Sequence, residues 1–239
     1  MNVVRVHFEI EQTAVTIISE RKYIGIAKDA IFDARSQIIS KISEDPYFGT
    51  AYESYAAASD DGCVVKRMCN SSVAASVGPM ASVAGAIAEY AVEKMVSAGA
   101  AYAIVDNGGD IALVTDRAVN IGMYADVNGK WLSMKIMPTE RILGICSSSA
   151  SVGPSVSFGG SDISTVISED VSLADACATA LGNAVNENDM IEPLEHVCGI
   201  DGVIGCLAYC SGMLSMCGDV PELVMSETDD RVVTKILLP

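Results

Sequence analysis

The stretch that decides the fold is AYAIVDNGGDIALV, residues 101–114. Two apolar runs flank a short polar turn that contains Gly108 and Gly109, and paired glycines adopt positive φ without strain. The stretch therefore predicts two antiparallel strands joined by a tight turn. A second role stays open, because glycines also let a ligand approach the backbone, and Asp110 suits either a ligand contact or the turn's own cap.

A helix of small residues is predicted immediately before this hairpin, in VGPMASVAGAIAEYAVEKMVSAG, residues 77–99. It begins just after Pro79 and ends at Gly99, which fits the left-handed residue that follows a helix. Gly85 lies inside it, and a mid-helix glycine costs about 1 kcal/mol relative to alanine. Gly85 therefore indicates that another backbone or a ligand comes very near, and close packing on a sheet is the simpler of these interpretations.

The rest of the chain predicts a mostly antiparallel sheet structure packed with helices. Residues 45–78 are mixed, with 63–72 typical of either a helix or a strand, and a short acidic segment follows residue 185. The predicted strands are 3–10, 13–19, 118–127, 130–136, 142–151, 163–168 and paired strands within 202–218, and the predicted helices are 23–42 and 172–185. No linker or fixed-period repeat is present, so we expect a single α+β domain over residues 1–239.

Charge and hydropathy exclude several function classes. The net charge of −16 argues against nucleic acid or an anionic membrane as a partner, because both are held by Lys and Arg. The first residues alternate apolar and polar, and no run reaches the roughly 18 apolar residues of a membrane span, so we expect a cytoplasmic protein. A homo-oligomer is compatible with these features. No Lys or Arg lies between Arg141 and Arg231, so phosphate bound by this half needs a cation or backbone N–H groups.

The eight cysteines form no C-x-x-C pair and are accompanied by only two histidines, so no zinc framework is predicted. Free cysteines of a cytosolic chain usually serve as small buried hydrophobes. Sulfur transfer or iron–sulfur ligation stays open because Cys206, Cys210 and Cys217 lie close together in sequence. An acidic segment, however, does not lower a thiol pKa, which a reactive cysteine requires.

One candidate metal site can be derived from helical spacing. Asp175 and Thr179 lie one turn apart in the predicted helix 172–185, so their oxygens share one side and suit a hard cation such as magnesium. The alternative is a capping box, in which Ser172 and Asp175 only satisfy the start of the helix. Ser147 and Ser148 end a strand and have hydroxyls that could contact phosphate oxygens.

In order along the chain, AGAIAEYAVEK, DNGGDI, GICSSSAS and ADACATAL resemble the ApbE family of flavin transferases, over roughly residues 78–186. The resemblance implies an FAD site lined by the turn Gly108, Gly109 and Asp110, and magnesium bound by Asp175 and Thr179. It also brings the helix backbone around Gly85 to Ala88 toward the nucleotide. A magnesium-dependent site for FAD or a related flavin nucleotide is therefore expected, and transfer of FMN to a hydroxyl, with AMP as leaving group, is the further implication.

The sequence also departs from that family. Ala88 and Glu89 stand before Tyr90, where the transferases carry lysine and glycine, and the segment SFGGSDISTVIS, residues 157–168, replaces a His-x-x-Asp-Pro-x-x-Gly motif. The overall pattern looks most similar to an ApbE-like branch of archaea and some bacteria, which has been linked with sulfur assimilation in anaerobic archaea. The alternative function is therefore a non-catalytic or accessory protein of sulfur assimilation that carries a cysteine persulfide.

Overall fold

The computed structural model describes residues 2–11, 13–127, 130–149 and 160–226. Their helices are α1 (Arg21–Glu44), α2 (Cys63–Ala75), α3 (Val83–Ser97), α4 (Val171–Ala184) and α5 (Ile191–Cys198), with 3-10 turns at Pro46–Gly49 and Pro79–Ser82. The strands are β1 (Val3–Ile10), β2 (Thr13–Glu20), β3 (Ala103–Asn107), β4 (Asp110–Val114), β5 (Val119–Val127), β6 (Lys130–Ile136), β7 (Leu143–Ser148), β8 (Ile163–Ser168), β9 (Val203–Cys210), β10 (Met213–Gly218) and β11 (Glu222–Ser226).

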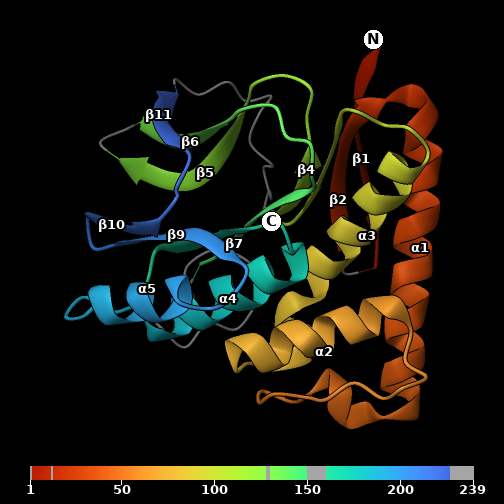
Figure 1. Cartoon of the computed structure of the whole chain (residues 1–239), viewed down its shortest axis with the longest axis horizontal. Helices are drawn as coiled ribbons and strands as arrows, with labels where there is room; N and C mark the ends of the chain where they lie inside the picture. The colour runs from red at the N-terminus through yellow and green to blue at the C-terminus, as the bar shows by residue number, and fades with distance from the viewer. Residues whose placement is uncertain (1, 12, 128–129, 150–159, 227–239) are drawn as a thin grey trace.

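An eight-stranded sheet in the order β1-β2-β3-β4-β7-β8-β9-β10 forms the centre of the molecule, and a three-stranded sheet in the order β11-β6-β5 lies beside it. Every strand pair found in the two sheets is antiparallel. Helices cover one face of the large sheet and the small sheet covers the other (Figure 1). The predicted α+β class with mostly antiparallel sheets is therefore confirmed.

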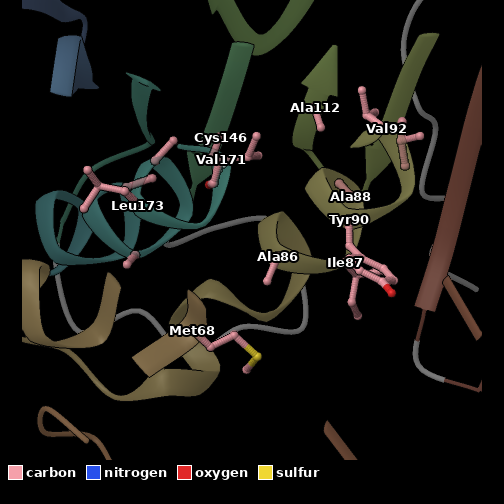
Figure 2. Close-up of a cluster of buried hydrophobic side chains, with 14 of the residues drawn as sticks. Met68, Ala86, Ile87, Ala88, Tyr90, Val92, Ala112, Cys146, Val171 and Leu173 are labelled. Carbon is pink, nitrogen blue, oxygen red and sulfur yellow. Dashed lines mark hydrogen bonds between the residues drawn. The ribbon is translucent and has the colours of Figure 1, made fainter. Parts of the chain in front are cut away.

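Each face of the large sheet has its own core, as the alternation of side chains along a strand requires. On the helix side, apolar side chains of α1, α2, α3 and α4 pack against the sheet, and Figure 2 shows Ala86, Ile87 and Ala88 of α3 at the centre of that layer. On the other side, Leu113 of β4 packs with Met134 of β6 between the two sheets.

The predicted helix over residues 23–42 is α1, and its apolar stripe is buried as its spacing indicates. Asp45 closes it, since the Asp45 N–H donates to the carbonyl of Lys41. The residues of this stripe that are buried are Ile24, Ala27, Ile31, Ala34 and Ile38, and Ile42 is half-buried.

Three other predictions are refined by the structure. Residues 63–72 are helical, as part of α2, and the acidic segment contains the short helix α5. The helix expected from Pro79 starts with a 3-10 turn and becomes α-helical at Val83, and Gly99 follows its end with φ +98°. The turn Asn128-Gly129 and most of the glycine-rich loop 153–162 lie outside the described residues.

Among the described residues no single helix is long and apolar enough to cross a membrane. Cys63–Ala75 and Pro79–Ser97 reach that length and apolarity only as a pair, with a bend of 107° between them.

Candidate functional site

Asp175 does not cap its own helix, so the capping-box alternative is wrong. The N-cap of α4 is Asp170, whose Oδ1 accepts the Leu173 N–H at 2.9 Å. Asp175 instead points across to α3, where its Oδ2 accepts the Gly85 N–H at 2.8 Å. A carboxylate at this place stabilises the start of α3, because the first amides of a helix have no partner within it.

Gly85 lies at a close approach of α3 and α4, and its neighbour is a helix rather than the sheet that the simpler interpretation suggested. A Cβ at Gly85 would lie 2.8 Å from the Asp175 Cβ and 2.8 Å from the Val171 carbonyl oxygen. Both distances are shorter than real Cβ atoms tolerate, so only glycine allows this approach. The first residues of α3 are thereby brought directly to the carboxylate of Asp175.

Thr179 meets the same segment one turn further along α4. Its hydroxyl donates to the Ala81 carbonyl at 3.4 Å, so Asp175 and Thr179 both face the start of α3. The i, i+4 spacing seen in the sequence therefore places an Asp carboxylate, a Thr hydroxyl and a backbone carbonyl in one region. Each of the three groups can offer an oxygen atom to a metal, and oxygen is the ligand type that magnesium prefers.

Asp110, the first residue of β4, is the second buried carboxyl of the site. Its strand partners are Asn107 and Cys146, so the three side chains share the face of the sheet that α3 and α4 cover. The carboxylate accepts a hydrogen bond from the backbone of Ser147 and contacts the Cys146 thiol. Within the part of the chain that the structure describes, its Oδ1 is buried and has no hydrogen-bond partner.

The two carboxyls are poorly stabilised as anions. Burial, and then the charges of Asp175 and Asp106, raise the pKa of Asp110 well above its usual range. Burial raises the pKa of Asp175 to about 7, although hydrogen bonds from the backbone of Gly85 and Ala84 lower it. A bound cation would relieve both penalties, because it would supply the positive charge that these groups lack.

The turn between β3 and β4 is built as its sequence predicts. Gly108 and Gly109 have φ +73° and +104°, and the Gly109 N–H donates to Oδ1 of Asp106 at 3.0 Å. A Cβ at either glycine would meet nothing within 4 Å, so positive φ, not crowding, requires glycine here. Asn107 donates through Nδ2 to the Ala84 carbonyl at 3.1 Å, which ties the turn to the start of α3.

The other residues predicted to contact the nucleotide do not all lie on the same side of the sheet. Ser148 lies on the α4 side of the sheet, and a Cβ at Gly182 would be 3.2 Å from its Oγ. Ser147 points to the opposite side, where its hydroxyl is 2.8 Å from Oγ1 of Thr165. Ala88 is fully buried in the helix-side core, and its assignment to a nucleotide site stays a prediction.

The sequence identifies Glu89 only as a departure from the transferase pattern. The structure shows that it is a further buried carboxylate between α3 and α4, which the sequence did not indicate. Its Oε2 accepts the Ser172 N–H at 3.1 Å and the Ser172 hydroxyl at 3.2 Å, at the first turn of α4. Arg67 of α2 lies 3.5 Å away from the same oxygen and pairs with Glu93 at 2.9 Å. Since Asp175 supports α3 and Glu89 supports α4, each helix start is held by a carboxylate of the other helix.

Comparison with solved structures places this architecture in the fold class of the ApbE flavin transferases. The flavin transferase ApbE of Vibrio cholerae superposes with a TM-score of 0.62 at 13% identity, covering 90% of this chain and 97% of that one. The ApbE protein of Thermotoga maritima superposes with a TM-score of 0.58 at 13% identity, covering 98% of this chain and 100% of that one. The chain belongs to the family described as AbpE bacteria, whose model matches residues 1–194.

Similar proteins of known sequence span nearly the whole chain. A UPF0280 protein of Methanocella arvoryzae is 44% identical over 236 residues and covers 95% of this chain and 94% of its own length. A UPF0280 protein of Methanothrix thermoacetophila is 45% identical over 235 residues and covers 97% of this chain and 99% of its own length. The resemblance to an ApbE-like branch with archaeal members is therefore confirmed.

Proposed function

We propose that this chain binds a flavin dinucleotide, FAD or a related nucleotide, with magnesium, where the starts of α3 and α4 meet the β3–β4 turn. One observation carries the proposal: Asp175 and Thr179, one turn apart on α4, both face residues 81–85 through the contacts to Gly85 and Ala81. Such a convergence of oxygen ligands is typical of a hard-cation site. The protein is expected to act in the cytoplasm on a small nucleotide.

The residues present fit a magnesium ion. The Asp175 carboxylate, the Thr179 hydroxyl and the Ala81 carbonyl would hold it, and the unpartnered Oδ1 of Asp110 adds negative charge nearby. Among the described residues no group of three or more His, Cys, Asp or Glu side chains is arranged to hold a metal. Magnesium tolerates so small a set, because it usually keeps water or substrate phosphate in its other positions.

The protein supplies two further groups that suit a dinucleotide. The N-terminus of α3 is one of them, because the start of a helix attracts anions, although its Ala84 and Gly85 amides already donate to the Asp175 carboxylate. The glycines of the turn leave open space beside the backbone, so a bulky ring system could lie against them without meeting a side chain. Asn107 ties the turn to the start of α3, and Asp175 ties α4 to the same start.

Transfer of FMN to a protein hydroxyl is the more specific form of the proposal. Magnesium bound here would polarise the pyrophosphate so that a hydroxyl displaces AMP. Asp175 would orient the metal, and the start of α3 would orient the phosphates, which lowers the entropic cost of reaction. His7 of β1 contacts Thr16 of β2 and His196 belongs to α5, so neither accompanies the Asp175 cluster.

Calorimetry tests the binding proposal. FAD should bind the wild type at least about tenfold more tightly with magnesium than without it, a difference of about 1.4 kcal/mol. Asp175→Asn and Thr179→Val, which keep side-chain size, should lose that difference. The matched control is Asp60→Asn, which removes an equal charge from an exposed turn and should retain it. FAD binding that does not change with magnesium in the wild type would refute the proposal.

The sulfur-assimilation alternative receives less support from the positions of its cysteines. Cys206 is fully buried, and burial raises its pKa to about 12, which opposes the thiolate that a persulfide carrier needs. Cys210 is also buried and its thiol donates to the Gly160 carbonyl at 3.2 Å. Mass spectrometry after exposure to a sulfur donor tests this alternative, which predicts added sulfur on Cys206, Cys210 or Cys217.

A further inference from the structure

Three cysteines meet at the end of the large sheet, where α5 packs on the β9–β10 hairpin (Figure 1). Cys198 is the last residue of α5, Cys206 lies on β9 and Cys217 lies on β10. Cys206 and Cys217 are direct partners in the strand register, so their side chains share one face of the hairpin. That face is the one that α5 covers, because the Cys206 thiol donates to the Leu194 carbonyl of α5 at 3.5 Å.

The thiols are close enough to interact. The Cys198 thiol interacts with the thiols of Cys217 and Cys206. Its Sγ also lies only 2.9 Å from the position that a Cβ would take at Gly218, the neighbour of Cys217. Glycine at 218 therefore leaves room for the Cys198 sulfur beside β10.

Exposure distinguishes the members of this cluster. Cys198 and Cys217 are partly exposed, whereas Cys206 is fully buried. A soluble reagent therefore meets Cys198 and Cys217 first. All three are free thiols in the structure, so this cluster is described in its reduced state.

We propose that Cys198 and Cys217 form a reversible disulfide, a redox modification site that lies away from the Asp175 cluster. A small disulfide of the glutathione class is the oxidant. The Cys217 sulfur attacks it, a mixed disulfide forms and one small thiol leaves. The Cys198 sulfur then attacks the Cys217 sulfur and releases the second small thiol, so two protein thiols lose two electrons and two protons and one small disulfide gains them.

The bond would have a mechanical consequence. It would tie the end of α5 to β10, which is the edge strand of the large sheet. Closing the chain between residues 198 and 217 restricts the unfolded state, so the oxidised protein should unfold at a higher temperature than the reduced protein. Disulfides in a reducing compartment are usually transient and redox-sensing, which fits a reversible bond.

A metal is a weaker interpretation of the same cluster. In the described ranges, to which these thiols belong, no set of three or more His, Cys, Asp or Glu side chains is placed to hold a metal ion. Burial, and then the contacts with Cys217, raise the pKa of Cys198 to about 11, so this thiol is protonated at neutral pH. Metal ligation would require its deprotonation, whereas exchange with a disulfide needs only a transient thiolate.

The experiment treats the full chain with oxidised glutathione under anaerobic, mildly alkaline conditions. Mass spectrometry then measures the intact mass and maps the peptides of the unreduced protein. A protease that cleaves after acidic residues is required, because trypsin finds no Lys or Arg between Arg141 and Arg231. Asp201 then separates Cys198 from Cys217. The expected product lacks two hydrogen atoms, contains a link between the two peptides and unfolds at a higher temperature.

Variants identify the partners. Cys217→Ser and Cys198→Ser should lose the link, and Cys198→Ser should retain glutathione as a stable mixed disulfide on Cys217. Cys210→Ser and Cys63→Ser are the matched controls, and both should form the link as the wild type does. A link that survives Cys217→Ser, or glutathione adducts without any internal link in the wild type, would overturn the proposal. None of these results depends on flavin binding.

Discussion

Gly85 determines how closely α3 and α4 approach, and hence where Asp175 meets the start of α3. A methyl group added at Gly85 would need the space that the Asp175 side chain and the Val171 carbonyl occupy. We predict that Gly85→Ala lowers the free energy of unfolding by roughly 1–3 kcal/mol, as is usual when a closely packed site is overfilled. Urea unfolding measures the change.

Gly25 offers the control for this substitution. It is an exposed glycine inside α1, and a Cβ there would meet nothing within 4 Å. Gly25→Ala should therefore stabilise the protein, by up to about 1 kcal/mol, because alanine is the better helix former. If Gly85→Ala proved as stable as Gly25→Ala, the close approach of α3 and α4 at this residue would be wrong.

The pair α3 and α4 is held by two carboxylates that act in opposite directions. Asp175 accepts from the start of α3, and Glu89 accepts from the start of α4. Glu89 stands where the transferase pattern has glycine, so this second contact uses a side chain that the pattern lacks. Its effect is to position α4, and with α4 the side chains of Asp175 and Thr179.

Glu89 should make the stability of this helix pair depend on pH. Burial raises its pKa to about 7 from an ordinary value of 4.5, although Arg67 lowers it. A carboxyl group with a higher pKa in the folded state keeps its proton there longer, so stability is greatest below about pH 4.5 and declines as the pH rises toward 7. We predict that Glu89→Gln removes the share of this decline that belongs to Glu89, on the order of 3 kcal/mol between the two pH values, and leaves the share of the other raised carboxyls, Asp110 and Asp175.

Chemical unfolding of Glu89→Gln and the wild type across this pH range measures the difference. The two proteins should have similar stability at the acidic end, because neutral Glu and Gln have nearly the same shape. Glu93→Gln is the control, since it removes the outer partner of Arg67 and leaves the Ser172 contacts intact. Parallel pH curves for Glu89→Gln and the wild type would show that Glu89 is not perturbed.

Much of the fold of the described residues could be predicted from local pattern. Alternation predicted the strands around the Gly108-Gly109 turn, and helical spacing predicted α1 and the common orientation of Asp175 and Thr179. The proximity of Asp110 to Asp175 was implied by the family resemblance and could not be predicted from local pattern, because β4 and α4 are distant in sequence and meet through the pairing of β4 with β7. The capping box was wrong because Asp170, three residues before Leu173, provides a better cap.

The single domain predicted over residues 1–239 has its own consequence for unfolding. The large sheet supports two cores, with Ile31 of α1 buried on the helix side and Leu113 of β4 buried against the small sheet. Because both cores rest on the same strands, we predict that they unfold together. Ile31→Ala and Leu113→Ala should each cost about 2–5 kcal/mol.

Two signals would follow these variants in urea: far-ultraviolet circular dichroism, which is dominated by the helical layer, and the fluorescence of Trp131 in β6, the single tryptophan. For a cooperative unit the two curves coincide in the wild type, and each substitution shifts both curves equally. If Ile31→Ala shifted only the helical signal and Leu113→Ala only the fluorescence, the two layers would be separate folding units. In that case the small sheet could unfold without disturbing the start of α3 and the Asp175 cluster on the opposite face.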